Sequence, residues 1–170
     1  MRFILPALLL MLSACDTVVK GPDPRDEFSD RNVGKTLVTY VDGLGSQVVH
    51  MAQSGKLYLW SSAGPEVQLG DWRYDILATG NATSYQGAGG INHPVEELET
   101  AWGICFRYLD KQGNILRRPS GGDWNCALLQ DYEALIIERA AGDPLRLASK
   151  GPREPLPSGI PLTMAQIQRL

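Results

Sequence analysis

Carboxylates and imidazoles are the side chains of this 170-residue chain that could catalyse hydrolysis. Asp71 and Asp123 each precede a tryptophan, and two carboxylates at a suitable separation can cleave a glycosidic bond. The histidines are His50, in a strand-like run, and His93, beside a proline, and no Gly-x-Ser-x-Gly sequence accompanies them. Turn residues entering strands explain the two aspartates better. We therefore expect a protein that is not an enzyme, with a carboxylate-dependent hydrolase as an alternative.

Two further groups of residues have the composition of ligand sites. Glu96, Glu97 and Glu99 form an acidic cluster near His93, which is either a weak site for a hard metal ion or, the favoured interpretation, a solvated loop face. A glycine-rich stretch at residues 87–90 lacks the flanking strand and helix of a phosphate-binding loop. The sequence predicts no metal ion and no cofactor.

A cysteine near the amino terminus carries the most specific motif. Leu12-Ser13-Ala14-Cys15 follows Arg2 and an apolar run over residues 3–11, which are the parts of an export signal. The run is about half the ~20 residues that span a bilayer. The four residues resemble the lipobox of bacterial lipoproteins. This resemblance implies a signal peptide over residues 1–14, acylation (including palmitate) of Cys15, and an anchor in the cell membrane that faces the periplasm. An ordinary secretory signal is the alternative.

The residue after the expected lipidation site bears on the choice of membrane. Asp16 is similar to the aspartate that retains enteric lipoproteins in the inner membrane. The resemblance therefore favours the inner membrane over the outer membrane.

The other two cysteines are expected to pair. If Cys15 is acylated, Cys105 and Cys126 remain, and the oxidising periplasm favours a disulfide between them. The alternatives are two free buried thiols or half of a metal site. Neither histidine lies at ligand spacing from a cysteine, which argues against the metal site.

Composition bounds the fold and the partners. The formal net charge is −3, and no basic stripe with interleaved aromatic residues is present, which argues against a nucleic-acid partner. The 18 glycines and 11 prolines indicate many turns and short strands rather than long helices.

Hydrophobic alternation locates the strands. Trp102, Ile104, Phe106 and Tyr108 share one face of the clearest strand. Other short strands are expected over residues 36–40, 47–52, 56–60, 66–69, 71–77, 115–118, 124–128 and 133–139. The fold class is therefore mainly β: an antiparallel meander or small up-and-down barrel with one disulfide and a short carboxyl-terminal helix capped by Thr163.

Four segments are expected along the chain. Residues 1–14 are the signal peptide, and residues 15–32 are a flexible tether because they hold few large apolar side chains. A short helix around residues 26–31 is the alternative for the end of this tether. Residues 33–149 form the β domain. Residues 150–170 are a proline-rich segment with the short helix.

A partner surface is expected where aromatic or loop residues lack an obvious place in the core. Trp60, Trp124 and His93 are the candidates. The glycine-rich residues 78–94 form a long connection, which is the first place to look for a binding edge.

Two family resemblances rest on short motifs between residues 34 and 148. Gly70-Asp71-Trp72, Ile104-Cys105-Phe106 with Tyr108, and Cys126 resemble a group of small exported bacterial proteins of unknown function. A weaker likeness, which adds residues 142–145, is to periplasmic metalloprotease inhibitors, although the insertion between Trp72 and Cys105 disturbs the register. We therefore expect a non-enzymatic binding or interaction module of the cell envelope, with a β-barrel protease inhibitor as an alternative.

Overall fold

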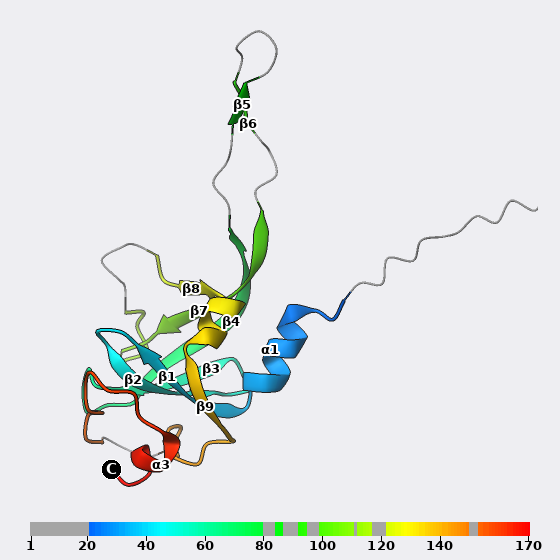
Figure 1. Ribbon diagram of the computed structural model, residues 1–170. Coiled ribbons are helices and arrows are strands. Elements are labelled where there is room, and N and C mark those ends of the chain that lie inside the picture. Colours follow the sequence, from blue (N-terminus) through cyan, green and yellow to red (C-terminus); the bar gives the residue numbers. More distant parts are fainter. Residues whose placement is uncertain are drawn as a thin grey trace, which may run out of the picture.

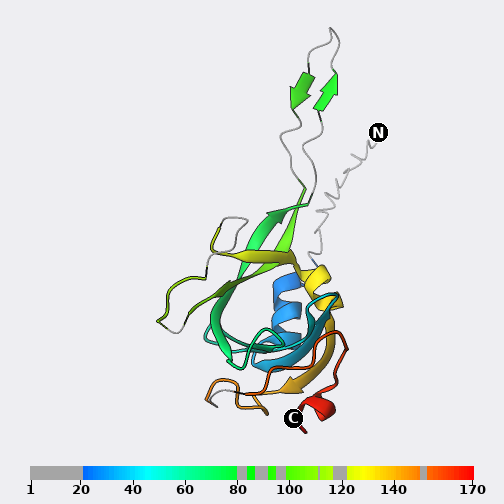
Figure 2. The same cartoon turned by 90° about the vertical axis from the view of Figure 1, so that its left-hand side faces the viewer.

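A seven-stranded antiparallel sheet curls into a half-barrel, which confirms the expected mainly β fold (Figures 1 and 2). The structure is a computed structural model and describes residues 21–79, 84–86, 92–94, 99–110, 112–116, 122–149 and 153–170. The strands of the half-barrel are β1 (Lys35–Val41), β2 (Gly45–Met51), β3 (Lys56–Ser61), β4 (Gln68–Ala78), β7 (Thr100–Tyr108), β8 (Asn125–Leu128) and β9 (Ile136–Ala141). Their order in the sheet is β8-β7-β4-β3-β2-β1-β9.

Tight turns and one long ladder set the register. Gly55, with φ 81°, lies in the turn between β2 and β3, a conformation that only glycine adopts readily. β4 pairs with β7 from Gly70↔Tyr108 to Ala78↔Thr100, and a Cβ atom on Gly70 would lie 2.5 Å from the Arg107 carbonyl oxygen. The ladder therefore requires glycine at this position. Between β4 and β7, β5 (Ser84–Gln86) and β6 (Asn92–Pro94) pair as a separate two-stranded sheet.

Among the strands that the structure describes, the two edges of the half-barrel do not pair with each other. β8 and β9 are the two edges of the sheet, and helix α2 (Leu129–Ala134) connects them (Figure 2). The sequence analysis expected a strand from residue 133, but residues 133–134 end this helix. Leu129 and Tyr132 are buried and lie three residues apart, so they face the core together on a helix. A helix of six residues carries too short a pattern to be recognised.

Helix α1 (Pro24–Asn32) forms the end of the expected flexible tether, so the alternative of a short helix around residues 26–31 is correct and the tether does not extend to residue 32. Asp23 caps this helix by accepting a hydrogen bond from the Arg25 backbone N–H at 2.9 Å. Phe28 is 4% exposed and inserts into the core of the half-barrel. Asn32 is fully buried and donates a hydrogen bond to Glu133 at 2.9 Å. One large apolar side chain and a buried amide therefore order a segment that is otherwise polar.

Two apolar clusters lie on opposite faces of β1, β2 and β3. The inner cluster fills the half-barrel, and it includes Leu37, Val49, Leu57, Ile104 and Phe106. The outer cluster joins Val38, Val48 and Trp60 of these strands to apolar residues of the carboxyl-terminal segment, Leu145, Leu147, Leu156, Leu162, Met164 and Ile167. This wall is therefore buried on both faces.

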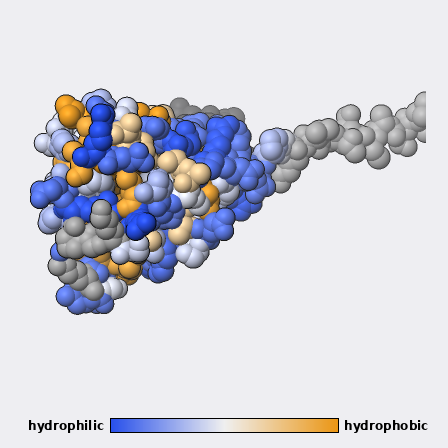
Figure 3. Space-filling view, turned by 90° about the horizontal axis from the view of Figure 1, so that it is seen from below, coloured by the Kyte–Doolittle hydropathy of each residue, from blue (hydrophilic) through white to orange (hydrophobic). Residues whose placement is uncertain are grey.

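The carboxyl-terminal segment ends in helix α3 (Met164–Ile167), which confirms the expected short helix. Thr163 accepts a hydrogen bond from the Gln166 backbone N–H, and the Gln166 side chain returns to the Thr163 backbone, which makes a capping box. Figure 3 views the molecule from this side. Hydrophilic residues cover most of the face, and hydrophobic residues form small separate groups. The segment thus covers the apolar outer wall.

Candidate functional site

A cavity of about 570 Å³ lies inside the half-barrel. Helix α1 ends at Asn32, just before β1 begins. The Gly34 N–H that follows the helix donates to the Met51 carbonyl at the end of β2. The cavity extends toward the opposite end, where Val41 and the turn residue Leu44 line it. Leu44 is 57% exposed, so the cavity reaches solvent at this end.

The walls of the cavity are apolar in the middle and polar near the mouth. Val49, Leu57, Leu59, Phe106 and Ala127 supply apolar walls from four strands. Polar, uncharged side chains approach the open end: Gln47, Ser61, Gln68 and Asn125. Each described residue that lines the cavity is uncharged in its ordinary protonation state. An apolar pocket with a few polar groups is the usual form of a small-molecule site.

Tyr132 of α2 lies at the inner end of the cavity. Its ring centre is 5.0 Å from that of Phe106 and 6.1 Å from that of Phe28, which belongs to the helix that covers the closed end. The residue is 8% exposed. Burial raises the pKa of the Tyr132 phenol well above its usual range, and nearby Tyr108 and Glu133 add to this. The phenol therefore keeps its proton and can donate a hydrogen bond.

The disulfide between Cys105 and Cys126 is present, as the sequence analysis predicted. The two residues are directly opposite each other on β7 and β8, with 4.0 Å between their Cα atoms. β8 is an edge strand that carries Asn125 and Ala127 of the cavity wall. The disulfide therefore fastens one wall of the cavity to the sheet.

Trp60 is not a surface residue, which corrects the sequence analysis. It is 3% exposed, and its indole N–H donates to the Glu154 carbonyl oxygen at 3.0 Å. The physical reason is that the carboxyl-terminal segment covers the outer face of β3. Sequence alternation along β3 cannot show that a distant segment returns to this face.

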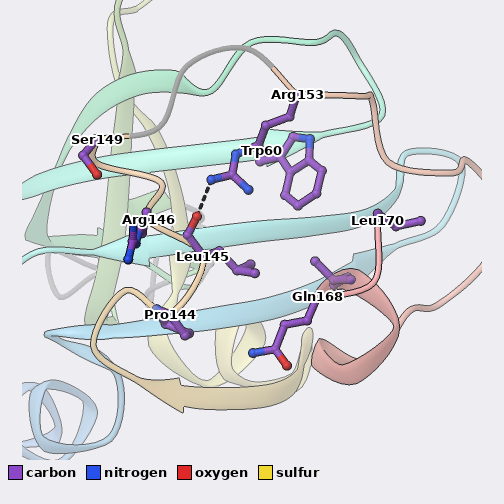
Figure 4. Close-up of a pocket in the computed structure, with 9 residues that line it drawn as sticks. Trp60, Pro144, Leu145, Arg146, Ser149, Arg153, Gln168 and Leu170 are labelled. Atoms are coloured by element: carbon purple, nitrogen blue, oxygen red, sulfur yellow. Dashed lines mark hydrogen bonds between the residues drawn. The ribbon is translucent and has the colours of Figure 1, made fainter.

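A second hollow, of about 540 Å³, lies between Trp60 and the carboxyl-terminal segment (Figure 4). The Arg153 guanidinium lies 5.0 Å from the Trp60 ring centre and donates to the Leu145 carbonyl oxygen. Partial burial lowers the pKa of Arg153, against the opposing effect of Asp143. These contacts join two parts of the carboxyl-terminal segment to each other and to β3. We therefore interpret the hollow as a gap left where this segment packs on the sheet, and not as a ligand site.

Trp124 is half-buried on the outer side of the sheet. The guanidinium carbons of Arg73 and Arg107 lie 4.3 Å and 4.7 Å from its ring centre. His93 lies in β6, opposite Tyr85, and its side chain is outside what the structure describes. Cys15 and Asp16 lie outside the described residues, as do most of residues 78–94 and the acidic cluster apart from Glu99.

Asp71 and His50, two of the residues considered for hydrolysis, have other roles in the structure. Asp71 faces outward from β4 and contacts Lys56 at 2.8 Å and Arg107 at 2.6 Å. Partial burial opposes its ionisation, but the hydrogen bonds from these two cations outweigh that effect and lower the pKa of Asp71. His50 lies 3.2 Å from the Thr36 hydroxyl, which in turn donates to the Gly142 carbonyl oxygen at 2.7 Å. These contacts hold strands together.

In the part of the chain that the structure describes, no group of three or more His, Cys, Asp or Glu side chains is placed to hold a metal ion. None of the described helices is long and apolar enough to cross a membrane.

Comparisons with known proteins do not assign a family. No protein-family model matches the chain, and no curated protein and no solved structure matches it. The class of protein is therefore described by its fold and its site. It is a half-barrel with one disulfide and a cavity lined by uncharged residues.

The sequence analysis missed the cavity and Tyr132. A pattern of alternating apolar residues predicts a core but does not predict whether the core is filled. Tyr132 stands in the short stretch Leu129–Ala134, where no motif distinguishes it. The one signal in the sequence is the spacing of three residues between Leu129 and Tyr132, which places both side chains on one face of a helix.

Proposed function

We propose that this protein is a non-enzymatic binding protein of the cell envelope, anchored by a lipid on Cys15, which holds a small apolar ligand in the half-barrel cavity. The observation that carries the proposal is the cavity of about 570 Å³ with uncharged, largely apolar walls. Small-molecule sites typically span roughly 300–1,000 Å³. An apolar molecule that enters such a space leaves water and gains contacts with the walls.

The position of Asp71 supports binding over hydrolysis. Asp71 and the cavity lie on opposite faces of β4, since Gln68 lines the cavity and Asp71 is three positions further along the strand. Its carboxylate is occupied by Lys56 and Arg107. A ligand in the cavity would therefore be out of reach of this carboxylate.

Ligand binding can be tested with N-phenyl-1-naphthylamine, a neutral fluorophore that brightens in apolar surroundings. The full chain, transferred from detergent into amphipol, should saturate with the probe at one site per chain. The matched control is Ala127→Phe, because Ala127 lines the cavity on an edge strand and a phenyl ring would fill the space. Equal probe fluorescence for both proteins would contradict the proposal.

The anchor is tested separately. Cys15→Ala should block removal of residues 1–14 and change the membrane fractionation of the protein. Unchanged processing and fractionation would rule out the lipid anchor. For the unaltered protein, separation of the two membranes on a density gradient tests the inner-membrane location that Asp16 favours.

A further inference from the structure

A groove of about 500 Å³ adjoins the mouth of the half-barrel cavity. One of its walls is the connection between β3 and β4, and the other is the stretch that follows β7. The groove and the cavity share four lining residues, which are Ser61, Ala63, Gln68 and Leu116. A molecule that fills the cavity and protrudes from its mouth therefore enters the groove.

Exposed leucines gather where the cavity and the groove meet. In the part of the chain that the structure describes, seven large hydrophobic side chains are exposed, and three of these, Leu44, Leu69 and Leu116, line the cavity or the groove. Leu69 is 36% exposed and Leu116 is 41% exposed. Single exposed hydrophobic residues are ordinary, whereas a group of them marks a binding surface. The apolar surface of the cavity therefore continues outside the half-barrel.

Charged side chains line the groove but not the described walls of the cavity. Glu66 and Asp110 belong to the groove. Hydrogen bonds from the side chain and the backbone of Asn114 lower the pKa of Asp110, so this carboxylate keeps its charge. A polar group would lose its hydration inside the cavity, whereas the groove offers it water and polar neighbours. The two spaces together match a molecule with an apolar chain and a polar end.

The length of the cavity sets how much of such a chain it can hold. Leu57 and Ser61 both line the cavity and lie four residues apart on β3, which corresponds to about 13 Å along a strand. An extended hydrocarbon advances roughly 1.3 Å per carbon, so a stretch of this length holds about ten carbons. A longer chain would place its remaining carbons against the leucines of the groove.

We infer that the ligand is an amphiphile with one long hydrocarbon chain, which fills the cavity, leaves through the mouth over Leu116 and Leu69, and places its polar end in the groove. This inference rests on the proposed function, because it names the ligand class of the same cavity. It makes the groove the part of the site that selects long chains over short ones.

The test compares alcohols of increasing chain length on three proteins. 1-Octanol, 1-decanol, 1-dodecanol and 1-tetradecanol are used to displace N-phenyl-1-naphthylamine from the full chain in amphipol, freed of detergent. The altered protein is Leu69→Asn, because Leu69 lines the groove and not the cavity. The matched control is Ile76→Asn on the same strand, where the side chain is 57% exposed and lines neither space.

The expected result depends on chain length. Each methylene that becomes buried should tighten binding roughly fourfold, and in the unaltered chain this gain should continue beyond 1-decanol. 1-Tetradecanol should bind roughly tenfold more weakly to Leu69→Asn, whereas 1-octanol should bind both proteins equally. Ile76→Asn should match the unaltered chain for every alcohol.

Nuclear magnetic resonance of ¹³C-methyl-labelled leucine locates the bound chain directly. 1-Octanol should shift the methyl signals of Leu57 and Leu59 in the cavity, and 1-tetradecanol should shift that of Leu69 as well. An unshifted Leu69 signal, equal loss of both alcohols in Leu69→Asn, or the same loss in Ile76→Asn would each overturn the inference while leaving the cavity a binding site. If the unaltered chain binds the fluorescent probe no better than Ala127→Phe, the proposed function itself fails, and the inference fails with it.

Discussion

Replacing Phe28 with alanine should detach helix α1 from the half-barrel. Phe28 is 4% exposed and is the apolar side chain of α1 in the inner cluster. It meets Tyr74 edge-on, with 6.1 Å between the ring centres, and lies 6.1 Å from Tyr132. Truncating a buried phenylalanine to alanine costs about 3–5 kcal/mol, which is a large part of the ~5–15 kcal/mol that holds a typical domain folded.

The effect on α1 itself should be larger than the effect on the strands. A helix of 9 residues is marginal in water without tertiary contacts. After the change, α1 keeps polar contacts such as the one between the Ser29 and Tyr74 hydroxyls at 2.6 Å, and a typical neutral hydrogen bond contributes only about 1 kcal/mol. We expect residues 24–32 to lose hydrogen-exchange protection.

Urea unfolding and hydrogen exchange followed by mass spectrometry provide the assay. The control is Glu27→Ala on the same helix, where the side chains of Glu27 and its partner Arg31 are each 53% exposed. Loss of such an exposed pair should change the unfolding free energy by no more than about 0.5 kcal/mol. Two results for Phe28→Ala would together refute the role assigned to Phe28. The α1 amides would stay protected, and the unfolding free energy would stay within about 1 kcal/mol of that of the unaltered protein.

Three further perturbations test the sheet. Replacing both Cys105 and Cys126 with alanine opens a link over a sequence separation of 21 and should lower the unfolding free energy in urea by about 3 kcal/mol; an unchanged midpoint would contradict this. Gly70→Ala should lower the melting temperature, because its Cβ would lie 2.5 Å from the Arg107 carbonyl oxygen, and a melting temperature equal to that of the unaltered chain would mean the ladder tolerates a side chain. The pKa of Asp71 is lowered by folding, so its ion pairs stabilise the protein above the ordinary pKa of 3.8 and are lost as the pH falls through the lowered value. Asp71→Asn should therefore destabilise the protein at pH 7 and have little effect at pH ~2, and equal effects at both pH values would refute the assignment.

The strands and the disulfide could be predicted because their causes are local in sequence. Trp102, Ile104, Phe106 and Tyr108 alternate over β7 and do face the inner cluster. Thr163 was identified as a helix cap from its position alone. Alternation and capping depend on neighbours a few residues away, so one sequence suffices.

The errors arose where distant segments meet. Trp60 is buried because Leu145, Leu147 and the apolar residues from Leu156 to Ile167 that the structure describes cover the outer face of β3, and Phe28 orders α1 because it inserts among the inner-cluster side chains of the half-barrel. The same limit applies to the site. Tyr132 became distinguishable from other tyrosines only when the curl of the sheet placed a cavity beside it. Such contacts leave no periodic pattern in the segments that make them.

The double-sided burial of β1, β2 and β3 sets an order of events during folding. The meander of these strands can pair as soon as residues 35–61 are free to fold, since each pairs with its neighbour in sequence. Val38, Val48 and Trp60 remain exposed until residues 145–167 follow to cover them. β9, which pairs with β1 across about a hundred residues of chain, must also wait, and such distant contacts form slowly. During that interval the unfinished outer wall is an apolar surface exposed to water.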